Sequence, residues 1–306
     1  MKKILLATTK PFAKVAVDGI KKIIADAGYE LVLVENYTEQ EDLIKAISDV
    51  DAVIIRSDIV DKQVLEAAKN LKLVVRAGAG TDNVDKKFAK EKDIIVMNTP
   101  GQNSNAVGEL VAGMMVYVSR NCFNGTSGSE LRGKKLGLHA FGYTGRAVNT
   151  IAKGFGMEVY AFDPFVKPEA MKAEGVTPVN NIEELYSTCQ FVSLHTPATP
   201  ETINSINYNL LSKMPKNAVL INSARKEVIN EADLIKIFTD RPDFKYASDV
   251  APDNSAEIAE KFTGRYFFTP KKMGAQTSEA NINAGLAAAN QIVNYFKNGD
   301  DKYRVN

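Results

Sequence analysis

Short apolar runs alternate with stretches of helical spacing along the first third of the chain. The runs have the length and composition of strands buried on both faces of a sheet. They are residues 3–7, 31–34, 52–55, 71–75 and 94–97. Between them, residues 15–27 and 41–47 repeat their apolar positions with the period of an amphipathic helix. This alternation predicts a parallel sheet covered by helices.

The turn Asn-Thr-Pro-Gly at residues 98–101 interrupts the alternation and predicts a domain boundary. Residues 106–120 are then expected to form one long, nearly continuous apolar helix, which suits burial between domains or subunits. After a polar stretch rich in glycine and serine, a second series of apolar runs occupies residues 134–140, 158–162, 191–194, 218–221 and 246–248. A final helix is expected at residues 277–297. The predicted fold class is α/β, with two doubly wound parallel sheets.

Length and charge agree with two domains and narrow the possible functions. With 306 residues, 45% of them hydrophobic, the chain can bury two separate cores. Lys and Arg number 38 against 37 Asp and Glu, so the surface lacks the strong positive field of a nucleic-acid binder or a protein held on anionic membranes. We therefore expect the partners to be a small molecule and another copy of the chain.

Neither a membrane segment nor a secretion signal is expected. No apolar stretch approaches the roughly 20 residues of a membrane-spanning helix, and polar residues break the apolar run that follows the charged N-terminus. The cysteines, Cys122 and Cys189, have neither paired nor metal-ligand spacing, so we expect buried thiols and no metal site. A reducing cytoplasm fits this pattern.

A dinucleotide-binding fingerprint follows the strand expected at residues 135–139. Residues 140–145, Ala-Phe-Gly-Tyr-Thr-Gly, lead directly into a helical stretch, although Ala140 stands where the fingerprint has its first glycine. Gly142 would let the backbone approach a pyrophosphate, and Gly145 would let the helix pack against the strand. The N–H groups of Tyr143 and Thr144 lie at the start of the helix and would be free to donate to the anion.

Asp163 strengthens this interpretation because it ends the next expected strand, where a carboxylate can accept hydrogen bonds from both ribose hydroxyls. The same carboxylate would repel a 2'-phosphate, so NAD is favoured over NADP. The alternative is a glycine pair that serves only helix packing, with an unrelated surface aspartate.

With this motif in place, the chain resembles the D-2-hydroxyacid dehydrogenases, and within them the short phosphoglycerate dehydrogenases. The matching segments are residues 74–85 (VVRAGAGTDNVD), 98–101 (NTPG), 106–109 (AVGE), 131–137 (LRGKKLG), 162–164 (FDP), 193–197 (SLHTP), 220–225 (LINSAR) and 249–250 (DV). Several signatures in one order are far more specific than the glycine motif alone.

The resemblance implies two domains, one that binds the substrate and one that binds NAD. A flavodoxin-like substrate domain would comprise residues 1–98 and 283–306, and a Rossmann-like NAD-binding domain residues 99–282, with a cleft that closes over the substrate. A homodimer built on the long helix after Pro100 is implied as well. Because the chain stops after its last helix, we expect neither the regulatory modules of longer relatives nor control by serine through them.

The resemblance also assigns ligand contacts. Those implied for NAD are Gly142, Tyr143, Thr144, Gly145, Asp163, Pro164, His195, Thr196, Pro197, Ser223, Ala224, Asp249 and Gly274. Those implied for the substrate are Arg56, Ser57, Ala79, Gly80 and Asn103. Arg56 and Ser57 would hold a phosphate, and the backbone around Ala79 and Gly80 would help to hold a carboxylate. Alternatively, Arg56 is a solvated charge at the end of a strand.

The catalytic set departs from that of the family, which has an Arg, a Glu and a His. Arg225 matches the arginine, whose planar guanidinium can grip a carboxylate and polarise the adjacent carbonyl; a structural ion pair is the alternative. The chain has only two histidines, His139 and His195, and neither can occupy the family's catalytic position near the C-terminus. Lys272 stands there when the segment is aligned from its right, and Lys271 when it is aligned from its left.

The family glutamate is missing too. Asn254 takes its position, and Asp253 is an acidic neighbour that we keep as a catalytic candidate. The two losses fit together, because the family carboxylate raises the pKa of an imidazole so that it carries a proton. A lysine, with an ordinary pKa of about 10.4, already carries a proton. A carboxylate that raised the lysine pKa further would hinder its role as a base, so the glutamate is not needed beside it. The resemblance also implies a branch of short phosphoglycerate dehydrogenases that uses lysine.

Three functions are therefore compared. The leading hypothesis is NAD-dependent oxidation of D-3-phosphoglycerate to 3-phosphohydroxypyruvate, the entry step of serine synthesis. A second is reduction of glyoxylate or hydroxypyruvate. A non-catalytic NAD-binding sensor or corepressor is the third, motivated by the missing His and Glu.

Overall fold

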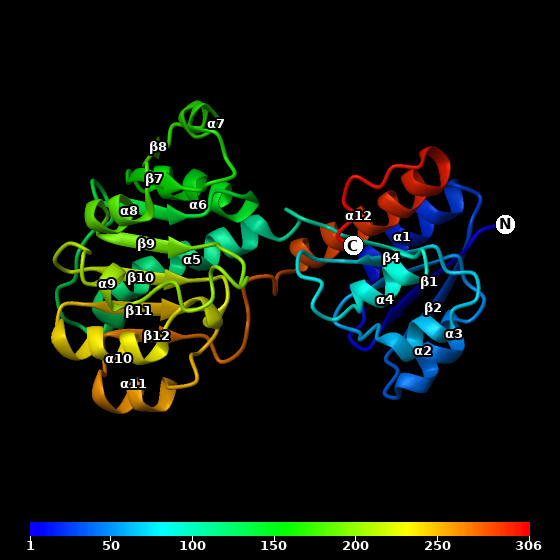
Figure 1. Cartoon of the computed structure of the whole chain (residues 1–306), viewed down its shortest axis with the longest axis horizontal. Helices are drawn as coiled ribbons and strands as arrows, with labels where there is room; N and C mark the ends of the chain where they lie inside the picture. The colour runs from blue at the N-terminus through cyan, green and yellow to red at the C-terminus, as the bar shows by residue number, and fades with distance from the viewer. The chain divides into compact units, whose positions relative to one another are not determined.

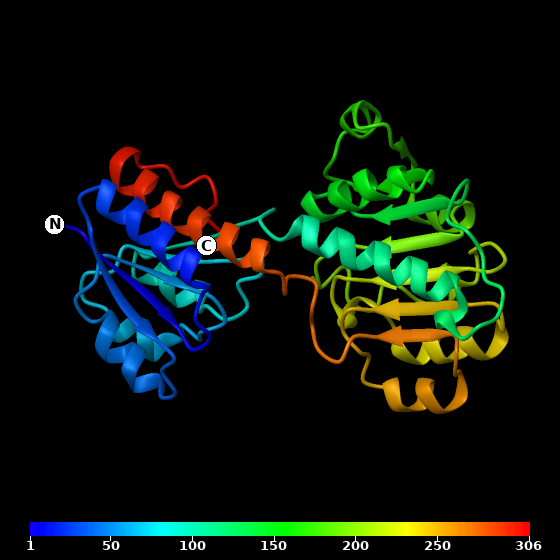
Figure 2. The same cartoon turned by 180° about the vertical axis from the view of Figure 1, so that it is seen from behind.

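A computed structural model describes all residues, 1–306, as two compact units. Unit 1 comprises Met1–Asn103 and Gln276–Asn306, and unit 2 comprises Ser104–Ala275 (Figures 1 and 2). The boundaries expected from the sequence, 98/99 and 282/283, differ by several residues. Thr99 stays with unit 1 because its N–H donates to Gly78 O, and helix α12 (Ser278–Asn298) already begins ahead of residue 283.

Unit 1 is built on a five-stranded, fully parallel sheet in the order β2-β1-β3-β4-β5, the flavodoxin-like arrangement. Its strands are β1 (Lys3–Thr8), β2 (Glu30–Glu35), β3 (Ala52–Ile55), β4 (Leu73–Arg76) and β5 (Ile95–Asn98). Its helices are α1 (Lys14–Asp26), α2 (Gln40–Ile47), α3 (Lys62–Ala67), α4 (Lys86–Glu91) and α12. One face of the sheet packs against α1 and α12, and the other against α2, α3 and α4.

Two glycines allow α1 and α12 to pack closely. A Cβ on Gly19 of α1 would stand 2.5 Å from Leu286 Cδ2 of α12. A Cβ on Gly285 of α12 would stand 3.1 Å from Ile20 Cδ1 and 3.2 Å from Phe12 Cε1. This contact brings the last helix of the chain beside its first turn.

Unit 2 is built on a seven-stranded parallel sheet in the order β12-β11-β10-β9-β6-β7-β8. Its strands are β6 (Lys135–His139), β7 (Glu158–Phe162), β8 (Thr177–Pro178), β9 (Phe191–Leu194), β10 (Val219–Asn222), β11 (Lys245–Ser248) and β12 (Tyr266–Phe268). Its helices are α5 (Ser104–Ser119), α6 (Tyr143–Gly154), α7 (Pro168–Ala173), α8 (Ile182–Thr188), α9 (Tyr208–Leu211), α10 (Glu231–Asp240) and α11 (Ser255–Lys261). The chain reverses its direction across the sheet between β6 and β9, the position where doubly wound folds bind ligands.

These two sheets confirm the predicted α/β class. Helix α5 is apolar on most sides because it packs on β10, β11 and α6. No helix of either unit is both long and apolar enough to cross a membrane. The expectation that both thiols are buried is wrong for Cys122, which follows α5 in a short turn at the surface and is only partly covered, whereas Cys189 is fully buried.

Candidate functional site

The turn between β6 and α6 has the form that the fingerprint requires. Ala140 has a φ of 81°, a left-handed conformation that a glycine would adopt more easily. A Cβ on Gly145 would stand 2.6 Å from Ala140 O, so only glycine permits this approach of helix to turn. Around Gly142, by contrast, a Cβ would meet nothing within 4 Å, which leaves the N-terminus of α6 open to a ligand.

Asp163, directly after β7, is bonded to this turn. One carboxylate oxygen accepts from Phe141 N at 2.8 Å, and the other accepts from Phe165 N at 2.8 Å. Each oxygen retains a further lone pair for a ribose hydroxyl. The open helix end and the carboxylate held beside it therefore fit the pyrophosphate and the ribose of NAD. Pro164 is exposed next to them.

The carboxyl ends of β9 and β10 bring His195 and Ser223 together. His195 Nδ1 lies 3.2 Å from Ser223 Oγ, and the backbone N–H of His195 donates to the backbone oxygen of His139. Burial lowers the pKa of His139 to about 4 and that of His195 to about 3. Both imidazoles are therefore neutral at pH 7. Thr196 and Pro197 follow His195, Thr196 buried and Pro197 exposed.

Arg225 lies three residues beyond β10 and is half-buried. The backbone on either side of it is held by Asn222, whose Oδ1 accepts from Ala224 N and whose Nδ2 donates to Arg225 O. Asn222 is itself buried at the end of the strand. The guanidinium is thus carried on a rigid turn.

The candidates for the glutamate position have other partners. Asp253 is exposed, and its carboxylate accepts from Lys226 Nζ. The Asn254 amide donates to Glu231 O at 2.9 Å, and the Glu231 carboxylate accepts from the backbone N–H groups of both residues. These contacts tie the segment to the start of α10.

The loop that carries Lys271 and Lys272 is fastened by Asp249. This carboxylate, 1% exposed, accepts from Met273 N at 2.7 Å, Gly274 N at 2.8 Å and Thr269 Oγ1 at 3.2 Å. Both lysine side chains are exposed, at the tip between the fastened ends. Asp249 was expected to contact NAD, and its observed hydrogen bonds hold the lysine loop.

In unit 1, Arg56 follows β3 and has a defined environment. Its guanidinium donates to Asn281 Oδ1 and to Lys10 O, and stands 5.1 Å from the centre of the Phe12 ring. Ser57 beside it is exposed. Sequence reasoning did not single out Asn281, because no motif links residues 56 and 281.

The segment after β4 contains two of the other expected substrate contacts, Ala79 and Gly80. Gly78 has a φ of 150°, and a Cβ there would overlap the Arg76 guanidinium, 1.6 Å from Nη1. Ala79 O accepts from Asn98 Nδ2 at 2.6 Å, while Ala79 itself is exposed and Gly80 is half-buried. Asn103 is half-buried at the end of the first part of unit 1.

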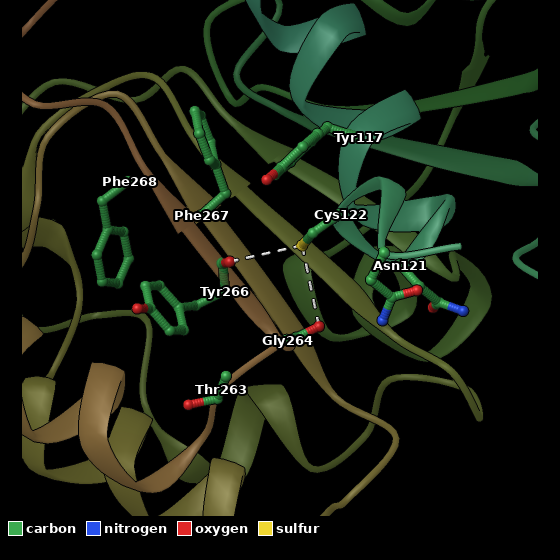
Figure 3. A pocket seen from close by; sticks show the side chains of 9 residues that line it. Tyr117, Asn121, Cys122, Thr263, Gly264, Tyr266, Phe267 and Phe268 are labelled. Atoms are coloured by element: carbon green, nitrogen blue, oxygen red, sulfur yellow. Dashed lines mark hydrogen bonds between the residues drawn. The ribbon is translucent and has the colours of Figure 1, made fainter. Parts of the chain in front are cut away.

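A cavity of about 420 Å³ lies elsewhere in unit 2 (Figure 3). Its lining comes from the end of α5, the turn after it, and β12 with the residues before it: Tyr117, Asn121, Cys122, Asn124, Thr263, Gly264, Tyr266, Phe267 and Phe268. Cys122 Sγ stands 3.9 Å from Gly264 O and 3.8 Å from Tyr266 O. The cavity contains none of the expected site residues.

Comparison with known proteins shows which family of domains unit 2 resembles. Residues 111–269 match the family model described as D-isomer specific 2-hydroxyacid dehydrogenase, NAD binding domain. A D-3-phosphoglycerate dehydrogenase of Methanocaldococcus jannaschii is 34% identical over 285 residues, which are 89% of this chain and 54% of that protein. The chain thus spans about half the length of that relative.

Two further similar proteins match over nearly their whole length. A hydroxypyruvate reductase of Thermotoga maritima is 34% identical over 282 residues, covering 86% of this chain and 90% of that protein. The crystal structure of a 3-phosphoglycerate dehydrogenase of Entamoeba histolytica with bound NAD+ is 46% identical. It covers 100% of this chain and 98% of its own, with a TM-score of 0.89.

Proposed function

The chain belongs to the D-isomer specific 2-hydroxyacid dehydrogenases, and from that premise we propose that it oxidises D-3-phosphoglycerate to 3-phosphohydroxypyruvate with NAD. The observation that carries this substrate is the held guanidinium of Arg56, because it adds a second cation in addition to Arg225, and the phosphorylated acid has a second anionic end that an unphosphorylated 2-oxo acid lacks. The phosphoglycerate dehydrogenases among the similar proteins support the same choice.

The residues of the chain divide the remaining chemistry between them. NAD supplies the hydride acceptor. Arg225 binds the substrate carboxylate and polarises the carbon–oxygen bond that reacts. In reduction Lys272 gives its proton to the substrate oxygen, and in oxidation it must first release that proton to solvent before its neutral amine can take the hydroxyl proton. The backbone at Ala79 and Gly80, with Asn103, completes the grip on the carboxylate, and Ser57 assists Arg56 at the phosphate.

Two assignments have stated alternatives. Lys271 is the other candidate for the proton, since it lies on the same loop. Asp253 is proposed as the carboxylate nearest to the family glutamate position, although its contact with Lys226 gives it a second, structural role. Cofactor contacts at His195, Thr196, Pro197, Ser223, Ala224, Asp249 and Gly274 are part of the same proposal.

Reduction of hydroxypyruvate is the second candidate function, favoured by the Thermotoga maritima relative that matches this chain over most of both lengths. Turnover of NADH with a panel of 2-oxo acids separates the candidates. We expect 3-phosphohydroxypyruvate to give the highest kcat/KM, above hydroxypyruvate and glyoxylate. A higher value for either unphosphorylated acid would favour the reductase, and no turnover with any acid would favour a non-catalytic NAD sensor.

We also propose that the protein is a cytoplasmic homodimer assembled on α5. The free thiols Cys122 and Cys189 suit a reducing compartment. On α5, Gly113 is exposed and has open space around its Cα, so another helix could approach there. Light scattering of the purified protein gives the oligomeric state, and Gly113→Arg should dissociate a dimer built on this helix.

A further inference from the structure

Three separate segments of unit 1 meet at Arg56. The turn after β1 contributes Lys10 and Phe12, the turn after β3 contributes Asp58, and α12 contributes Asn281. Arg56 is half-buried, and burial lowers the pKa of its guanidinium. An arginine that served only as a solvated charge would not need guanidinium contacts from two distant segments, the turn after β1 and α12.

Asp58 fastens the two turns to each other. Its carboxylate, 3% exposed, accepts from Thr9 N at 2.7 Å, Tyr37 OH at 2.9 Å and Arg56 N at 3.0 Å. Burial and the bond to Asp58 raise the pKa of the Tyr37 hydroxyl, which therefore stays a donor. The carboxylate thus binds the backbone N–H of Arg56 rather than its guanidinium, whose N–H donors it leaves available to an anion.

Asn281 orients the guanidinium itself. Its Nδ2 donates to Thr277 O at 2.8 Å in the preceding turn, so Oδ1 is directed to Arg56 Nη2. Phe12, 5% exposed, lies beneath the guanidinium and packs against Gly285, one turn further along α12. The first turns of α12 therefore fix both the tilt and the height of the guanidinium plane.

We propose that Asn281 and Asp58 are positioning residues for substrate specificity: they hold Arg56 so that its remaining N–H donors face the phosphate of the substrate. The inference rests on the proposed function, in which Arg56 binds that phosphate. A guanidinium has five donors in one plane, and Asn281 and Lys10 O engage donors on its two terminal nitrogens. A preorganised fork binds a phosphate without first losing its rotamer freedom.

The test compares substrates that differ only in the phosphate. With NADH, we expect Asn281→Ala to raise the KM for 3-phosphohydroxypyruvate about tenfold, with kcat and the KM for hydroxypyruvate nearly unchanged. Asn281→Asp should raise the first KM further, because a carboxylate would neutralise Arg56. Asp58→Asn should act in the same direction, since its amide N–H group would face the N–H groups of Thr9 or Arg56.

The chain offers matched controls. Asn290 is also on α12 and donates to the carbonyl four residues earlier, Leu286 O, without contacting Arg56. Asp61 accepts only from Val64 N, at the start of α3. Asn290→Ala and Asp61→Asn should leave both KM values unchanged. In an Arg56→Ala background, Asn281→Ala should have no further effect.

Each result decides a different question. If Asn281→Ala raises both KM values equally, or neither, the positioning role is wrong while the proposed function stands. If Arg56→Ala itself leaves the KM for 3-phosphohydroxypyruvate unchanged, Arg56 is not the phosphate ligand and both proposals fall. Calorimetric titration of the NADH-bound protein with 3-phosphoglycerate and with glycerate makes the same comparison without turnover, so it remains decisive if a variant is inactive.

Discussion

At the scale of single residues, Ala140 is the most unusual part of the cofactor turn. Its φ of 81° costs a residue with a Cβ about 1–2 kcal/mol. Glycine would avoid this cost, although its greater freedom in the unfolded chain offsets about 0.5–1 kcal/mol. We expect Ala140→Gly to raise the free energy of unfolding by up to about 1 kcal/mol in urea denaturation. As a control, Ala170→Gly in the exposed helix α7 should lower the free energy of unfolding. A loss of stability from Ala140→Gly would contradict the strain argument.

Asp163 has two expected roles, holding the turn by hydrogen bonds and selecting the cofactor by its charge, and substitutions can separate them. It accepts from the backbone of the turn and is expected to select NAD over NADP by its charge. Asp163→Ala should weaken NADH binding and relax the rejection of NADPH, because both duties are lost. Asp163→Asn can still accept from Phe141 N, so it should relax the rejection with less loss of stability. Fluorescence titration with both cofactors measures this, and equal affinities in the unmodified protein would refute the assignment.

At the scale of structural elements, the loop between β12 and α12 presents two lysines between fastened ends. Asp249 holds it at Thr269 and at Met273 and Gly274, so the tip has a defined position although its side chains are exposed. A positioned acid–base group contributes roughly 100-fold or more to turnover. We expect Lys272→Ala to lower kcat by about that factor with NADH affinity retained, and Lys271→Ala to lower it far less. Should Lys272→Ala stay near full activity while Lys271→Ala loses it, the proton belongs to Lys271.

At the scale of the whole molecule, the sequence predicts elements better than contacts. The central strands are continuous apolar runs, and β3, β7 and β9 begin and end where expected. β8 and β12 were not predicted. β8 has only two residues, one of them a proline, and β12 is a half-buried edge strand of three residues. Candidate site residues that follow a strand can be proposed from their motifs. The contact of Asn281 with Arg56 joins residues 225 positions apart, and only the packing of α12 on α1 creates it.

The two units should differ in how their stability responds to acid. Both histidines lie in unit 2, and their folded pKa values, about 4 and about 3, are below the ordinary value of 6.5. Below pH 6.5 the unfolded chain therefore binds protons that the folded unit does not. Stability is complete at pH 7 and falls as the pH decreases from 6.5 toward 4.

We expect unit 2 to lose roughly 1–2 kcal/mol per histidine between pH 7 and pH 5, since each unit of pH is worth about 1.4 kcal/mol per proton. Unit 1 has no histidine and should change little over this range. Hydrogen exchange followed by mass spectrometry, corrected for the intrinsic rate at each pH, reports on the two units separately. His195→Gln should remove about half of the loss in unit 2. An equal loss in both units would show that the histidines are not its cause.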